Sequence, residues 1–192
     1  MNRLCLIVAL WALALASGCM ASFSQRPPLP EYSGPSSPMP VKLEVSGEDF
    51  LYLTTTEKVE APFSTSLAGV ASDVVSRSGW VRVASESEDS AVLSIHVTNT
   101  QGPGPGLLST LTAFLIPGIV DHQISVLVKL SPPDDSPREC GGSVVIRTWY
   151  QTFFIILYPF RSPAYNRMKT AEALTLGCVA DLLRDDGVRS RS

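Results

Sequence analysis

Alternation of apolar and polar residues predicts that much of this chain forms β-strands. The clearest case is the run in which Leu93, Ile95 and Val97 alternate with polar residues, the pattern of a strand buried on one face. A first strand is expected over residues 41–45. Gly47 interrupts the pattern, which resumes over 50–55, so we expect either one strand with a bulge or two short strands. The other predicted strands cover residues 80–83, 124–130 and 144–148.

Apolar residues at spacings of three and four predict two helices, one before residue 80 and one near the C-terminus. Pro62 suits the first turn of the first helix, and Gly79 stands where a C-terminal cap belongs. In the second helix, Ser162-Pro163 provides a cap and a first-turn proline, and Gly187 marks the end. The two apolar stripes are Phe63, Leu67, Val70 and Val74, and then Met168, Ala171, Thr175, Cys178 and Leu182.

The order of these elements predicts an α+β fold, in which an antiparallel β-sheet has two helices packed on one face. The runs over 124–130 and 144–148 are separated by a turn-rich connection, so we expect them to form an antiparallel hairpin. A single α+β domain is expected over residues 41–187, followed by a disordered tail over 188–192.

The first 18 residues have the organisation of an export signal. Arg3 precedes an apolar run over residues 4–15, and small residues then lead to Cys19. An ordinary secretory signal cut near Ala16 and an uncleaved anchor are the alternatives, but the apolar run is short for a spanning helix. In each case the chain is expected to be exported.

The sequence Leu15-Ala16-Ser17-Gly18-Cys19 resembles the lipobox of bacterial lipoproteins. The resemblance implies that residues 1–18 are a lipoprotein signal peptide, that cleavage occurs before Cys19, and that Cys19 becomes lipidated and holds the protein to a membrane. Met20 stands where an aspartate would imply retention at the inner membrane. We therefore expect the periplasmic side of the outer membrane.

Residues 19–40 combine the lipidated cysteine with a Pro- and Ser-rich stretch whose apolar residues follow neither a helical nor a strand period. Such composition is typical of a semi-extended tether. A polyproline-like chain rises about 3 Å per residue. This tether would allow the domain to stand several tens of ångströms from the membrane.

Charge and cysteine content narrow the remaining functions. The chain has 15 basic side chains, and Arg3 leaves with the signal, so 14 basic and 18 acidic side chains remain. The basic side chains form no stripe of the kind that binds nucleic acid, so we expect no nucleic-acid partner. Of four cysteines, Cys5 leaves with the signal and Cys19 carries lipid. Cys140 and Cys178 remain in a compartment that permits disulfides and could pair; the alternative is that Cys178 is a small buried apolar residue.

The chain shows no catalytic or metal-binding pattern. His96 lies on the outward face of its predicted strand, and His122 is expected in a solvated turn before the strand at 124. The spacing of His and Cys fits no zinc site, and no G-x-S-x-G sequence supports hydrolysis. We expect neither an enzyme nor a cofactor.

Two strongly apolar segments, residues 107–120 and 150–160, flank the predicted hairpin and should lie at the same end of it, opposite the turn. They either cover one another as an auxiliary core or leave a surface exposed for a partner or a membrane. The candidate surface residues are Leu111, Phe114, Leu115, Ile116, Pro117, Ile119, Phe153, Phe154, Ile156 and Tyr158.

With the lipobox, the order of elements over residues 41–186 resembles small α+β lipoproteins of Gram-negative envelopes, such as the lipopolysaccharide-assembly lipoprotein. The resemblance implies a non-enzymatic, outer-membrane-anchored periplasmic lipoprotein. We expect it to support an envelope assembly or transport complex through its apolar surface. The alternative is a module that binds lipid or another apolar ligand. The oligomeric state is left open.

Overall fold

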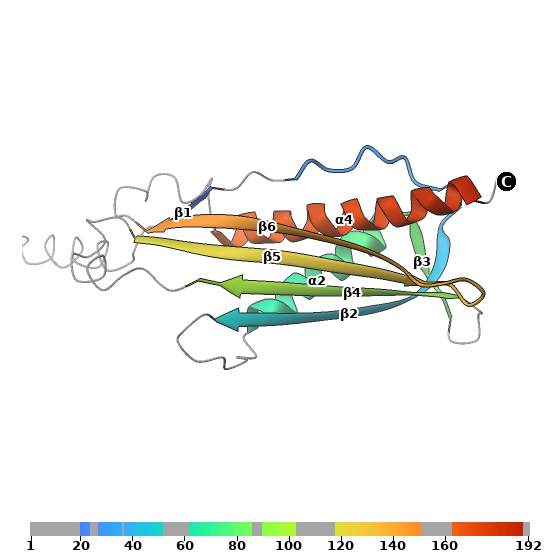
Figure 1. Ribbon diagram of the computed structural model, residues 1–192, viewed down its shortest axis with the longest axis horizontal. Coiled ribbons are helices and arrows are strands. Elements are labelled where there is room, and N and C mark those ends of the chain that lie inside the picture. Colours follow the sequence, from blue (N-terminus) through green and yellow to red (C-terminus); the bar gives the residue numbers. More distant parts are fainter. Residues whose placement is uncertain are drawn as a thin grey trace, which may run out of the picture.

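A six-stranded sheet forms one layer of the structure, in the order β1-β6-β5-β4-β2-β3 (Figure 1). The computed structural model describes residues 20–23, 27–35, 37–51, 62–85, 90–102, 118–150 and 163–189. Its elements are β1 (Met20–Phe23), β2 (Met39–Leu51), α2 (Pro62–Arg77), β3 (Val81–Val83), β4 (Ala91–Gln101), β5 (Gly118–Ser131), β6 (Arg138–Tyr150) and α4 (Pro163–Arg189).

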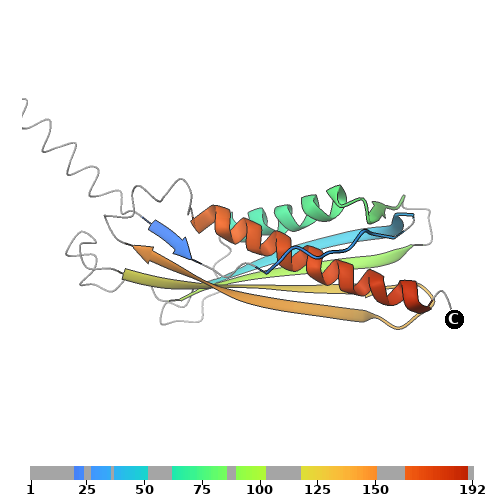
Figure 2. The ribbon, with the colours of Figure 1, turned by 90° about the horizontal axis from the view of Figure 1, so that it is seen from above.

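Both helices lie on the same face of the sheet and form the second layer (Figure 2). Helix α2 packs over β2 and β4, and α4 packs over β5 and β6. The predicted α+β class and the placement of both helices on one face are therefore confirmed. The opposite face of the sheet, which neither helix covers, is called the open face below.

The prediction of a purely antiparallel sheet is wrong for β2. This strand runs parallel to β4 along its length and parallel to β3 over three residues, whereas β4, β5 and β6 are antiparallel. Helix α2 carries the chain back between β2 and its parallel neighbours, which is the crossover that parallel pairing requires. Residue alternation identifies a strand but does not indicate its direction.

Strand β2 is also continuous where a break was expected. Val41 to Leu51 pair with Ala91 to Gln101 in one unbroken register, with Gly47 opposite Val97. The backbone of Gly47 takes part in the ladder like its neighbours, so the lack of a side chain there produces neither a bulge nor a second strand.

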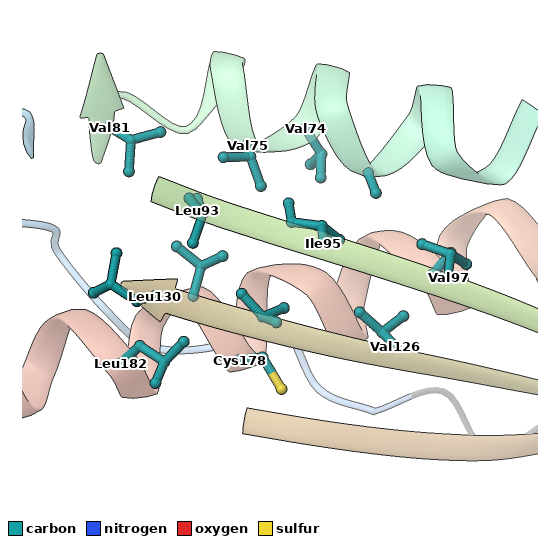
Figure 3. Packing of buried hydrophobic residues seen from close by; sticks show 14 of the residues in the cluster. Val74, Val75, Val81, Leu93, Ile95, Val97, Val126, Leu130, Cys178 and Leu182 are labelled. Atoms are coloured by element: carbon teal, nitrogen blue, oxygen red, sulfur yellow. The ribbon is translucent and has the colours of Figure 1, made fainter. Parts of the chain in front are cut away.

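The core lies between the helices and the inward face of the sheet (Figure 3). Leu93, Ile95, Ile124, Leu130 and Ile146 are its largest fully buried side chains. The predicted helical stripes supply Leu67 and Val74, and Ala171, Cys178 and Leu182. Met168 does not belong to this core, because 43% of it is exposed.

The predicted helix ends agree with the structure except at the C-terminus. Helix α2 begins at Pro62, and Gly79 follows it with a φ of 73°, the left-handed conformation that favours glycine. Helix α4 begins at Pro163 but continues past Gly187 to Arg189. The first two residues of the predicted tail are therefore helical.

Part of the predicted tether lies on the domain. Met20–Phe23 forms β1 and pairs antiparallel with the end of β6, and Met39 already belongs to β2. Between them, residues 27–35, called the strap below, run beside α4 (Figures 1 and 2). A strand of four residues beside proline-rich sequence gives too little alternation to be recognised without its partner strand.

Candidate functional site

The end of the sheet that lies next to Cys19 is where the sequence predicts contact with a membrane. Met20 pairs with Tyr150, Tyr150 pairs with Gly118, and the backbone N–H of Gly102 donates to the carbonyl of Asp121 at 2.7 Å. We call this the anchor end. It is where the described chain begins, directly after Cys19, and where β4 and β6 end and β5 starts (Figure 1).

Most of the residues predicted for lipidation or for a partner surface lie outside the described residues. These are Cys19, Leu111, Phe114, Leu115, Ile116, Pro117, Phe153, Phe154, Ile156 and Tyr158. Ile119 is described: it lies in β5 at the anchor end, on the open face, and is 43% exposed. The described chain stops at Gly102 and Tyr150 and resumes at Gly118, so the predicted placement of the two apolar segments stays a prediction.

The open face carries exposed aliphatic side chains that the sequence reasoning did not single out. Leu127 is 45% exposed and Val145 is 54% exposed, on the neighbouring strands β5 and β6. The signal was available in the sequence. Ile124, Val126 and Val128 are apolar and buried, so an apolar residue at the odd position 127 must point away from the helices.

A shallow hollow lies beside Leu127. It has a volume of about 300 Å³ and is lined by His96, Thr98, Ser125, Val126, Leu127, Gly141, Gly142 and Ser143. Gly141 leaves the space open on this face, since a Cβ there would lie 3.6 Å from the Leu127 side chain. The lining mixes polar and apolar side chains, and His96 Nδ1 shares a hydrogen bond of 2.9 Å with Ser46.

The charges that flank this hollow are paired across strands. Arg147 donates two hydrogen bonds of 2.9 Å to the carboxylate of Asp121, which lowers the pKa of Asp121 and raises that of Arg147. Lys129 lies 3.1 Å from Glu139. Since each pair joins β5 to β6, the open face presents aliphatic groups between internally neutralised charges.

Cys140 and Cys178 are joined by a disulfide, with their Cα atoms 5.3 Å apart. Cys140 belongs to β6 and Cys178 to α4, so the bridge connects the two layers. Nearby, Arg138 donates to the carbonyl of Leu182 at 3.3 Å. Both cysteines therefore have a structural role at this position.

The expectation of a solvated turn at His122 is wrong. His122 lies in β5, points into the helix layer and is 2% exposed. Burial, with the charge of Arg167, lowers its pKa to about 4. Within the described ranges, its Nδ1 has no hydrogen-bond partner, nor have the hydroxyls of the buried Thr148 and Thr170.

No three His, Cys, Asp or Glu side chains of the described residues gather as potential metal ligands. Likewise, no described helix is long and apolar enough to cross a membrane.

No family model matches the chain, and no curated protein matches it significantly. Among solved structures, the chain is similar to a PelC variant dodecamer from Paraburkholderia phytofirmans. The two share 13% identity over 85% of this chain and 97% of that one, with a TM-score of 0.36. A likeness this distant assigns neither a family nor a function.

Proposed function

We propose that this protein is an outer-membrane-anchored periplasmic lipoprotein, without enzymatic activity, that supports an envelope assembly or transport complex. Lipidated Cys19 supplies the membrane attachment, as the lipobox resemblance implies. The partner protein binds the open face of the sheet. The observation that carries this proposal is the exposure of Leu127 and Val145, which project from adjacent strands on that face.

The chemistry of the open face suits a protein partner. When a partner covers half-exposed aliphatic side chains, the free energy of binding becomes more favourable by roughly 25 cal/mol per Å² of apolar surface removed from water. The flanking pairs Arg147–Asp121 and Lys129–Glu139 keep local charge balanced. A polar rim around apolar anchors is the usual anatomy of a protein interface.

Adjacent residues of β5 offer a matched test, because they point to opposite faces. Leu127→Asp places a charge on the open face, so we expect thermal unfolding within a few degrees of wild type and a strong loss of partner recovery. Val128 is 0% exposed, so Val128→Asp buries an unpaired charge and should unfold the domain.

The measurement is quantitative co-purification from envelopes in mild detergent, with the melting temperature of each variant as the folding control. If Leu127→Asp and Val145→Asp both retain the partner at wild-type levels, the open face is not the interface. If stoichiometric extractable lipid accompanies the protein in place of a membrane protein, the apolar-ligand alternative replaces this proposal.

A further inference from the structure

We propose that the anchor end of the sheet rests directly on the lipid bilayer, so that the strands stand away from the membrane and no flexible tether intervenes. The surface comprises the first residues of β1 and the Ile119–Trp149 pair, and its partner is the phospholipid headgroup layer. This inference rests on the proposed function only in requiring lipid on Cys19.

Very little chain is available between the lipid and the sheet. Met20 already pairs with Tyr150 at the end of β6. Consecutive Cα atoms are about 3.8 Å apart, so a lipid carried by the residue before Met20 enters the bilayer next to the sheet. The predicted tether of residues 19–40 supplies no slack as long as β1 remains paired.

The strap packs against residues at the far end of the domain. The ring centroids of Tyr32 and Trp80 are 5.1 Å apart in an edge-to-face arrangement, and the guanidinium carbon of Arg184 lies 5.8 Å from the Tyr32 centroid. Gly34 lies so close to Trp80 that a Cβ would come within 2.6 Å of the indole. The strap is therefore packed along the domain.

The anchor end also carries an apolar pair suited to a lipid headgroup layer. At the anchor end, Ile119 lies opposite Trp149 on the open face, and this pair combines an exposed aliphatic group with a half-buried indole. Tryptophan favours the interface between water and lipid.

Strand β5 provides a ruler perpendicular to the proposed membrane surface. Ile119, Gln123, Leu127 and Ser131 all lie on the open face at intervals of four residues. At about 3.3 Å per residue, successive positions are separated by roughly 13 Å. A probe at Ile119 should therefore lie near the headgroups, whereas one at Ser131 should be about 40 Å farther away.

The experiment places one cysteine at each ruler position in the full lipidated protein, which is reconstituted in phosphatidylethanolamine–phosphatidylglycerol vesicles. The disulfide occupies Cys140 and Cys178, and lipid occupies Cys19, so the introduced thiol alone reacts with bimane. Headgroup-region spin-labelled lipid is the quencher. We expect quenching to be strong for Ile119→Cys, weak for Gln123→Cys and absent for Leu127→Cys and Ser131→Cys.

A flat profile along β5 overturns the proposal, whether all four probes are quenched or none is. Fatty-acid labelling of the same preparation separates this failure from that of the proposed function. An unlabelled protein refutes the lipid anchor, whereas a labelled protein with a flat profile refutes the orientation alone.

A second variant tests whether β1 pairing sets the orientation. Twelve glycine and serine residues inserted between Cys19 and Met20 keep the lipid and the strand but introduce slack. We expect an unchanged melting temperature and at least a fivefold loss of quenching at Ile119. A gradient that survives the insertion contradicts the inference that the short connection holds the anchor end to the bilayer.

Discussion

At the scale of single residues, Gly34 and Gly69 provide a matched pair for testing the strap. Gly34 has a φ of 82° and faces Trp80, whereas Gly69 lies in α2 with no atom within 4 Å of a Cβ. We expect Gly34→Ala to lower the free energy of unfolding by about 1–3 kcal/mol. Gly69→Ala should raise it by about 0.5–1 kcal/mol through helix propensity.

Urea unfolding of the two variants beside wild type measures both effects. Equal stabilities for Gly34→Ala and wild type would show that the strap does not pack against Trp80. The Gly69 variant confirms that the assay detects a change of this size.

His122 should make stability depend on pH. Its pKa is about 4 in the folded protein and near 6.5 when unfolded, so between these values the unfolded chain binds more protons. Stability is therefore full above pH 6.5 and falls as pH drops toward 4, by about 3 kcal/mol. The comparison is the urea midpoint at pH 7 and pH 4 for wild type and His122→Gln.

His96→Gln is the control, because His96 lies half-buried on the open face rather than in the core. The His122 variant should lose most of the pH-dependent difference and the His96 variant should retain it. If the His96 variant lost the difference and the His122 variant retained it, the pH dependence of stability would not arise from His122.

The burial of His122 could have been predicted from strand parity. Ile124, Val126 and Val128 set the inward face of β5, and position 122 continues the same even series. The turn was expected because the strand was predicted to start at Ile124, whereas β5 already starts at Gly118. Asp121 therefore belongs to the strand, points outward and is held by Arg147. The groups that surround a polar residue at an inward position can be identified only from the tertiary structure.

At the scale of elements, the bridge between β6 and α4 should contribute substantially to stability. Cys140 and Cys178 are 38 residues apart, and closing a loop of that length removes entropy worth about 4 kcal/mol from the unfolded chain. We expect the double variant Cys140→Ala, Cys178→Ala to lose about 2–4 kcal/mol of unfolding free energy.

Alkylation under denaturing, non-reducing conditions checks the bridge itself in exported protein. Neither cysteine should react until a reductant is added. Two reactive thiols before reduction would show that the disulfide between Cys140 and Cys178 does not form in the exported protein.

Local periodicity predicted the helices and most strands because each has one face that must be buried. The stripes at Leu67 and Val74, and the alternation from Leu93 to Val97, carry that information in the sequence. Strand direction and partner choice depend on contacts between distant segments. The parallel pairing of β2 and the existence of β1 were therefore not predictable from local pattern.

At the scale of the whole molecule, the lipobox resemblance predicts that Cys19 is the membrane anchor. Cells labelled with a fatty-acid analogue should mark the wild type, while Cys19→Ser should be unmarked and released into the soluble fraction. A single acyl chain binds membranes only marginally, so stable attachment requires the multiple chains of a lipoprotein.

The soluble Cys19→Ser protein should keep the melting temperature of the lipidated one, because β1 begins after the anchor residue. Equal fatty-acid labelling of both proteins would refute Cys19 as the site. Retention of the unlabelled variant in the membrane would indicate that another surface holds it there.

The pairing of β1 with β6 also determines when this fold can be completed. In the lipoprotein that we propose, export would deliver the chain from its N-terminus, so Met20 would enter the periplasm long before its partner Tyr150. Contacts between such distant residues form late and slowly. Under this proposal, β1 stays unpaired at the membrane until β6 has been exported, and only then is the orientation of the domain fixed. The proposed docking onto envelope proteins would thereby be restricted to chains that have been exported in full.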